Sequence, residues 1–107
     1  MKIEDVIKIF KIYKTSNKND NRTIIEHKNN IINGIEIGVV LSKIEKNEYE
    51  VFLHSKYKNE VISQIYYKKY KVKEEAFKSY RVMEQYITDN QLDKIVFMIE
   101  NNTWNNT

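Results

Sequence analysis

The residues best suited to chemistry in this chain gather in one basic and aromatic segment, residues 66–73 (YYKKYKVK). Residues 56–81 carry eight Lys and Arg against three acidic residues, whereas residues 82–107 carry one against four. Aromatic rings separated by lysines can stack on bases and neutralise phosphates. A Tyr-rich, partly charged surface also suits contact with a protein. We therefore identify a candidate partner-binding surface made of Tyr66, Tyr67, Lys68, Lys69, Tyr70, Lys71, Lys73, Lys78 and Arg81.

A plainer interpretation of this segment stays open. Lys, Ile, Asn and Tyr make up 53 of the 107 residues, a bias that AT-rich codons produce. Tyr and Lys can therefore fill strand positions by default, and Lys on an edge strand opposes aggregation. Strict alternation would send the even-numbered residues 66–72 to one face and the odd-numbered residues 67–73 to the other.

His27 and His54 are the two histidines, and both fall in expected strands. Histidine serves metal sites and acid–base catalysis because its pKa lies near neutral pH. A single strand histidine is more often a surface or structural residue. We therefore assign neither histidine a catalytic or ligand role.

Other site chemistries lack their parts. The chain has no Cys, so it has no thiolate ligand or nucleophile, and Gly34 and Gly38 alone cannot form a phosphate-binding loop. Glu74 and Glu75 open an expected helix, where the helix dipole accounts for them. No compact set of acids with a nearby Lys marks a metal-dependent nuclease. We expect no catalytic residue, no metal and no cofactor, and hence a protein that is not an enzyme.

The spacing of apolar residues predicts a helix over residues 3–14, because Ile3, Val6, Ile7 and Phe10 recur on one stripe. A polar loop follows over residues 15–21, and residues 23–27 resemble a short strand. Alternation predicts better strands over residues 35–44 and 49–54. A three-residue loop at residues 45–47 would set Val51 opposite Leu41 and Leu53 opposite Val39, with Asn47 in a left-handed conformation.

Asn33-Gly34 has the composition of a two-residue hairpin turn. Pairing Ile32 with Ile35 would, however, place Lys28 opposite Val39 and Glu26 opposite Leu41, with charges on the apolar face. The pattern therefore favours a longer loop over residues 28–33.

The remaining elements complete an α+β domain. We expect a loop over residues 56–60, a long strand over 61–73, a helix over 74–88 ended by Asp89 and Asn90, and a last strand over 94–99. The order is α-β-β-β-β-α-β. It predicts a mostly antiparallel sheet of four to five strands with an N-terminal helix and a helix in the C-terminal half.

Residues 1–99 are expected to form a single domain, and residues 100–107 (ENNTWNNT) a flexible polar tail. The first residues carry two acids and no long apolar stretch, so we expect no signal peptide. The longest apolar run is about five residues, too short for a membrane span. A cytoplasmic location in a bacterial host cell fits the absence of Cys. The sequence does not indicate an oligomeric state.

In general build the chain resembles the small accessory proteins of low-GC phages and mobile elements, including anti-CRISPR proteins. The shared features are a charged N-terminal helix (Lys2 to Ile7), a hairpin (Val39 to Leu53) and a following helix (Glu74 to Thr88) in one small domain. The resemblance implies a non-enzymatic inhibitor that binds a host protein or nucleoprotein complex, such as a defence nuclease. The net charge of +3 favours docking on an acidic or mixed protein surface over mimicry of DNA. A small nucleic-acid-binding or regulatory protein that uses the Lys- and Tyr-rich strand is the alternative.

Overall fold

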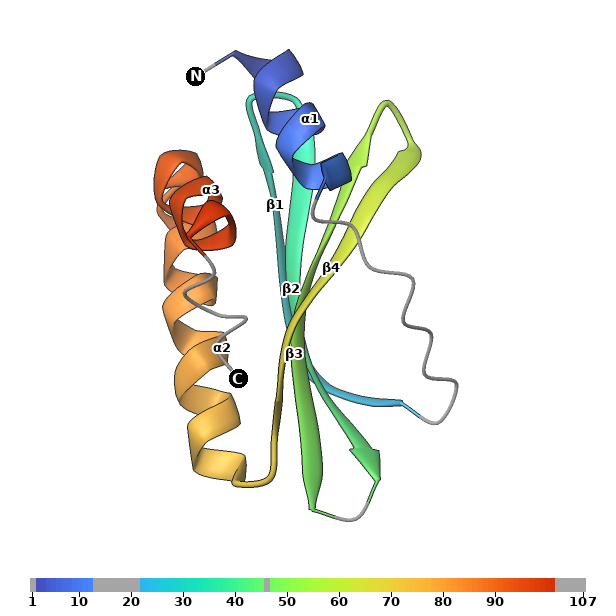
Figure 1. The fold of residues 1–107 in the computed structure, drawn as a ribbon, viewed down its shortest axis with the longest axis vertical. Coiled ribbons are helices and arrows are strands. Elements are labelled where there is room, and N and C mark those ends of the chain that lie inside the picture. Colours follow the sequence, from blue (N-terminus) through green and yellow to red (C-terminus); the bar gives the residue numbers. More distant parts are fainter. Residues whose placement is uncertain (1, 13–21, 46, 102–107) are drawn as a thin grey trace.

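The computed structural model describes residues 2–12, 22–45 and 47–101, with residues 45, 63, 66 and 67 described by their backbone alone. Within these residues the fold is α+β, as predicted: an antiparallel sheet in the order β1-β2-β3-β4, with helices on one face (Figure 1). The elements in chain order are α1 (Ile3–Ile12), β1 (Thr23–Ile32), β2 (Ile35–Glu45), β3 (Glu48–Tyr57), β4 (Glu60–Tyr70), α2 (Lys73–Thr88) and α3 (Leu92–Glu100).

The main core lies between the sheet and α2. Alternate residues of β2 from Ile35 to Leu41 point to this helix-facing side and are fully buried. On α2 the apolar residues recur every three or four positions, so their side chains lie on one face of the helix and pack against the sheet. The stripe consists of Ala76, Tyr80, Met83 and Ile87, all fully buried.

Helix α1 lies across one end of this core, beside α3 and the β3–β4 hairpin (Figure 1). Val6 and Phe10, one turn apart, are buried there, and Glu4 and Asp5 occupy the first turn. The predicted helix is confirmed up to Ile12. Its last two predicted residues and the predicted loop over residues 15–21 lie outside the described residues.

The β2–β3 hairpin is confirmed with its predicted register, but the predicted three-residue loop over residues 45–47 is wrong, because β2 extends to Glu45, which pairs with Glu48. Leu41 pairs with Val51 and Val39 pairs with Leu53. Asn47 has φ 62°, the left-handed conformation expected of it. The turn chemistry and the apolar alternation agree here, and together they fix which side chains reach the core.

The predicted loop over residues 28–33 is wrong. β1 continues to Ile32, which pairs with Ile35 across Asn33 and Gly34, whose φ values of 52° and 83° form a tight hairpin turn. Lys28 does lie opposite Val39, and Glu26 does lie opposite Leu41.

This register places polar side chains of β1 on the helix-facing side of the sheet, and polar contacts to α2 compensate for their partial burial. β1 is an edge strand, so its helix-facing side chains meet the flank of α2 rather than the core. Asn30 donates its Nδ2 hydrogens to the carbonyl of Ile87 at 2.9 Å and to Oδ1 of Asn90 at 2.7 Å. Arg81 reaches Oε2 of Glu26 at 2.9 Å. Two of the polar residues of β1, Asn30 and Glu26, therefore find their partners at the helix and its C-terminal end.

The next two elements differ from prediction mainly at their ends. The predicted loop over residues 56–60 contracts to a second tight turn at Lys58 and Asn59, with φ values of 52° and 66°. β4 ends at Tyr70 rather than at residue 73, and α2 starts at Lys73. As predicted, α2 stops at Asp89 and Asn90, and Asn90 takes a positive φ of 56°.

The predicted last strand over residues 94–99 is wrong, because these residues lie in helix α3. Its buried positions follow a helical period, and Phe97 between them is 62% exposed. A short apolar run does not distinguish a strand from a buried helix. The buried residues are Leu92, Ile95, Val96, Met98 and Ile99. Four strands are therefore observed in the described residues, in the order α-β-β-β-β-α-α.

Residue 100 closes α3 rather than opening a tail, and residues 102–107 lie outside the described part of the chain. No helix in the described part has the length and apolar content needed to cross a bilayer.

A buried ion pair holds the start of β1 against the sheet face that points away from α2, here called the far face. The Arg22 guanidinium bonds Oε1 of the fully buried Glu50 and lies 4.4 Å from the centre of the Phe52 ring. Removing one partner of such a pair leaves an uncompensated charge in a poorly solvated place.

We predict that Arg22→Ala lowers the free energy of unfolding by about 3–5 kcal/mol, because Glu50 is left unpaired. Urea denaturation measures the loss. Arg81→Ala is the control, because it breaks ion pairs of exposed side chains with Glu26 and Glu84 and should cost much less. Equal losses in the two variants would contradict this role for Arg22.

Candidate partner-binding surface

Some residues of the predicted binding surface lie close together in the structure, where β4 ends and α2 begins. Lys68 and Tyr70 lie on the helix-facing side of β4, because they pair with Val51 and Tyr49 of β3. With α2 they border an open hollow of about 420 Å³. Its lining is Lys68, Tyr70, Glu75, Lys78, Ser79 and Val82.

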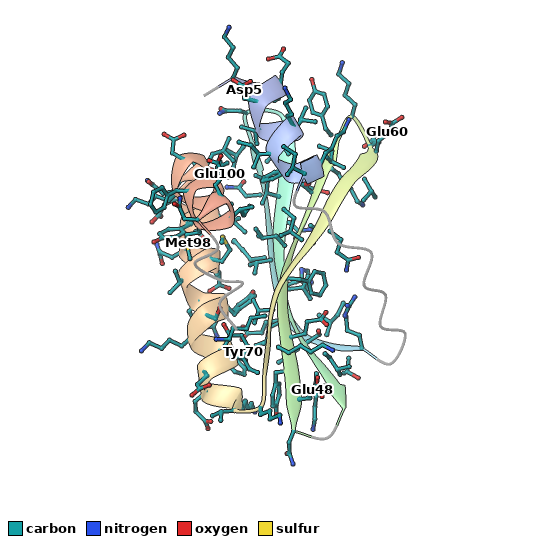
Figure 2. The ribbon with its side chains drawn as sticks, in the orientation of Figure 1. Asp5, Glu48, Glu60, Tyr70, Met98 and Glu100 are labelled. Carbon is teal, nitrogen blue, oxygen red and sulfur yellow. The ribbon has the colours of Figure 1, made fainter. Side chains whose placement is uncertain are left out.

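Two lysines, Lys68 and Lys78, line this hollow, and two more lie close to Tyr70 in the chain. Lys71 follows Tyr70 directly and Lys73 comes two residues later; both are exposed, as is Lys78 on α2. Lys73 lies 5.6 Å from the centre of the Phe77 ring. We call Lys68, Tyr70, Lys71, Lys73 and Lys78 the basic surface. Figure 2 shows Tyr70 beside the first turns of α2, toward the end of the molecule that lies away from α1.

Tyr70 is the aromatic centre of the basic surface and is half-buried. The Lys68 ammonium lies 5.2 Å from the centre of its ring, so this cation occupies one face of the ring. Burial raises the pKa of the Tyr70 hydroxyl; Glu75 adds to the rise and Ser79 opposes it. The hydroxyl therefore stays protonated at neutral pH.

Two predicted residues lie elsewhere. Lys69 points to the far face, since it pairs with Glu50, and its Nζ lies 3.7 Å from Oε1 of Glu48. Arg81 lies on the β1 side of α2, where it bonds Glu26 and Glu84. The structure does not bring these two side chains to the hollow.

The side chains of Tyr66 and Tyr67 lie outside the description, but their backbone is informative. Residue 66 pairs with Phe52 and residue 68 with Val51, so residue 67 is an extra, unpaired residue in β4. This bulge shifts the two-residue period of the strand. The predicted strict alternation over residues 66–73 is therefore wrong.

The two histidines lie on the far face, and His54 occupies a position that the sequence did not reveal. A Cβ on Gly38 would lie 2.2 Å from Nε2 of His54 and 2.3 Å from Oδ1 of Asn29, so both side chains extend over the bare glycine backbone. Burial lowers the pKa of His54, and Lys56 and His27 lower it further, while Glu36 opposes them. A glycine inside a strand often marks such a close approach, and this was the available signal.

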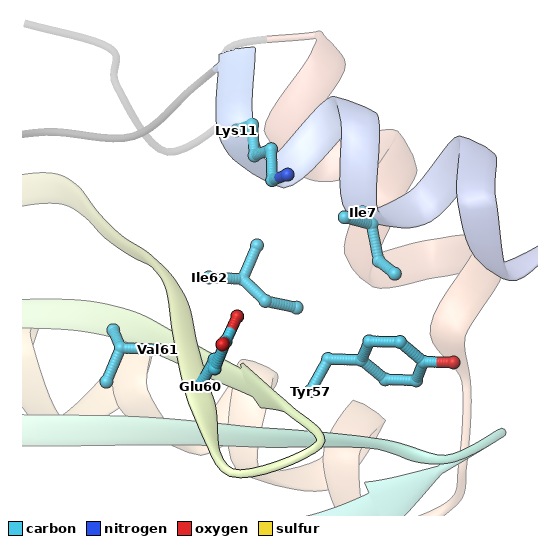
Figure 3. A pocket seen from close by; sticks show the side chains of 6 residues that line it. All are labelled: Ile7, Lys11, Tyr57, Glu60, Val61 and Ile62. Carbon is cyan, nitrogen blue, oxygen red and sulfur yellow. The ribbon is translucent and has the colours of Figure 1, made fainter.

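Two of the other hollows on the described surface are larger than the hollow beside Tyr70. Figure 3 shows one of about 500 Å³ between α1 and the β3–β4 hairpin, with Lys11 and Glu60 at its edges and Ile7 and Tyr57 in its wall. The other lies along α2 and α3, where Lys94 stacks over the Tyr86 ring at 5.6 Å. Among the described residues, no group of three or more His, Asp or Glu side chains is arranged to hold a metal ion.

No family model, curated protein or solved structure matches the chain. Within the described residues, the basic surface is where the predicted binding residues converge in greatest number. Its lysines and its half-buried tyrosine can form charge-assisted hydrogen bonds and apolar contacts with an anionic partner.

We predict that Gly38→Ala displaces the His54 side chain toward solvent, because the new methyl group takes its place. The pKa of His54 should then rise toward its ordinary value, as followed by NMR titration of the ring protons. Glu36→Gln is a control of opposite sign, since it removes a charge that raises this pKa. An unchanged pKa of His54 in Gly38→Ala would show that its imidazole does not lie over Gly38.

The lowered pKa of His54 also predicts how stability depends on pH. The unfolded chain takes up a proton on this residue more readily than the folded chain, so stability rises with pH. The free energy of unfolding should therefore fall on acidification from the ordinary pKa of His, about 6.5, down to the lower folded value. His54→Gln should flatten the profile in this window, measured by urea denaturation at successive pH values. A profile identical to wild type would refute the assignment.

Proposed function

We propose that the protein is a small, non-enzymatic binding protein that docks its basic surface onto an acidic surface of a partner protein. The observation that supports this most is the concentration of exposed or half-exposed lysines in the hollow and in the adjoining segment from Tyr70 to Lys73. Lys68, Lys71 and Lys78 form no ion pair within the described residues, and Glu75 is the one acid in the lining of the hollow. Positive charge that is not neutralised within the fold attracts an anionic surface.

The shape of the surface favours a protein partner over a nucleic acid. Bases stack on open aromatic faces, whereas Lys68 already covers one face of the Tyr70 ring. The hollow also includes the apolar Val82 and the acidic Glu75, a mixture typical of protein interfaces. The nucleic-acid alternative is supported by the same lysines, which can neutralise phosphates.

The biological use that fits best is stoichiometric inhibition of a host nuclease complex. A small rigid domain with a basic surface can cover an acidic or mixed face of such a complex and block access to its nucleic-acid channel. The resemblance to small phage accessory proteins supports this use.

The test is charge reversal. We expect Lys71→Glu/Lys78→Glu to abolish recovery of a stoichiometric partner from a low-GC bacterial lysate, because both lysines then repel an acidic surface. Lys2→Glu/Lys8→Glu makes the same charge change on exposed positions of the α1 region and should leave recovery intact. Circular dichroism checks that both variants fold.

Two outcomes would count against the proposal. Equal recovery with both variants would show that the basic surface is not used. A shift of DNA or RNA that weakens steeply with salt and is lost in Lys71→Glu/Lys78→Glu would favour the nucleic-acid alternative.

A further inference from the structure

Within the described residues, no strand pairs with the outer edge of β1. Ile32 and Ile35 flank a two-residue turn and so form a hydrogen-bonded pair; alternation then turns the backbone groups of Ile31, Asn29 and His27 away from β2. The backbone N–H of Ile31 donates a hydrogen bond to Oδ1 of Asn30 at 2.9 Å. The backbone groups of His27 and Asn29 are left facing outward at the middle of the strand.

Glu26 and Lys28 place charges near the middle of this edge, but the strand is ten residues long and contains no proline. β1 has one bulge near its start, at Ile25, and its pairing with β2 is regular from Glu26 to Ile32. It also exposes large apolar side chains: Ile24 is 56% exposed, Ile25 37% and Ile31 68%.

The opposite edge of the sheet, β4, is better protected. Its pairing with β3 shifts in two places, and Lys68 and Lys69 lie near its end. α1 also packs against it. Of the two edges, β1 is therefore the one prepared to pair with another strand.

The sequence of β1 is complementary to itself when two copies run antiparallel with His27 opposite His27. Glu26 then lies opposite Lys28 of the second copy, and Lys28 opposite Glu26 of the second copy. These charge pairs occur on the same face and occur twice, as two-fold symmetry requires. Shifting the two-fold axis to Lys28 would instead oppose two like charges.

We propose that β1 pairs with β1 of a second copy of this chain in this register, joining two sheets into one continuous sheet. The pairing satisfies the outward backbone groups of His27 and covers part of the exposed isoleucine surface. It also adds Lys28 of the second copy beside Glu26, which Arg81 already holds. The surface involved is separate from the basic surface, so the dimer does not depend on the proposed function.

Single cysteines test the register, because the chain has no Cys of its own. Paired residues across antiparallel strands lie about 4.5–5.5 Å apart between their Cα atoms, within the range of a disulfide. His27→Cys should therefore form a covalent dimer on mild oxidation with oxidised glutathione, seen on a non-reducing gel. Asn29→Cys is the matched control: it shares the strand and the face, but it lies opposite Ile25 of the second copy and should form no covalent dimer. Equal cross-linking of both variants, or none of either, overturns the proposal.

Charge exchange gives a second readout, by light scattering across a concentration series. Wild type should show the mass of a dimer, and Glu26→Lys should weaken association because it places two lysines opposite each other. Glu26→Lys/Lys28→Glu should restore association, with thermal unfolding as the check that each variant is folded. Lys71→Glu/Lys78→Glu should remain dimeric, which separates this test from that of the proposed function. A wild-type mass of one chain at every concentration would refute the dimer.

Discussion

The burial of one side of β2 under α2 is the constraint on which the rest of this structure depends. Alternate residues of β2 from Ile35 to Leu41 fit against the stripe from Ala76 to Ile87 with no exposed area on either side. A shift of one residue would turn charged and small residues into this layer, so the register of both neighbouring strands is fixed. Because α2 starts soon after β4, the same packing places Lys68 and Lys78 in the lining of one hollow.

Local sequence predicted the fold where two independent signals agreed. At the β2–β3 hairpin, a turn residue suited to positive φ and the alternation of Leu41 with Val51 indicated one register. At Asn33-Gly34 the turn composition indicated a tight hairpin, whereas the apolar alternation argued against it. The loop was predicted in error because every residue opposite the apolar face of β2 was expected to be apolar. Asn30 and Glu26 instead find polar partners on α2, more than fifty residues away in the chain. The strand predicted over residues 94–99 was wrong for another reason, because a run of five apolar residues shows neither a helical nor a strand period.

The candidate surface was predictable in composition but not in arrangement. Residue types identified the segment from Tyr66 to Lys78. They could not show that Arg81 faces β1 or that a bulge at residue 67 shifts the strand period. The placement of His54 over Gly38 was equally hidden, because it depends on strand pairing that brings residues sixteen positions apart into contact. In each case the deciding interaction joins separate elements.

The order of the strands has a kinetic consequence. In the described sheet each strand pairs with its neighbour in the chain, and two of the connecting turns contain two residues each. Closing such short loops costs little chain entropy, so the sheet can grow hairpin by hairpin before α2 docks on it. The chain also contains no proline, so the slow isomerisation of X–Pro bonds cannot delay folding. This architecture is therefore suited to acquire its native form quickly after synthesis.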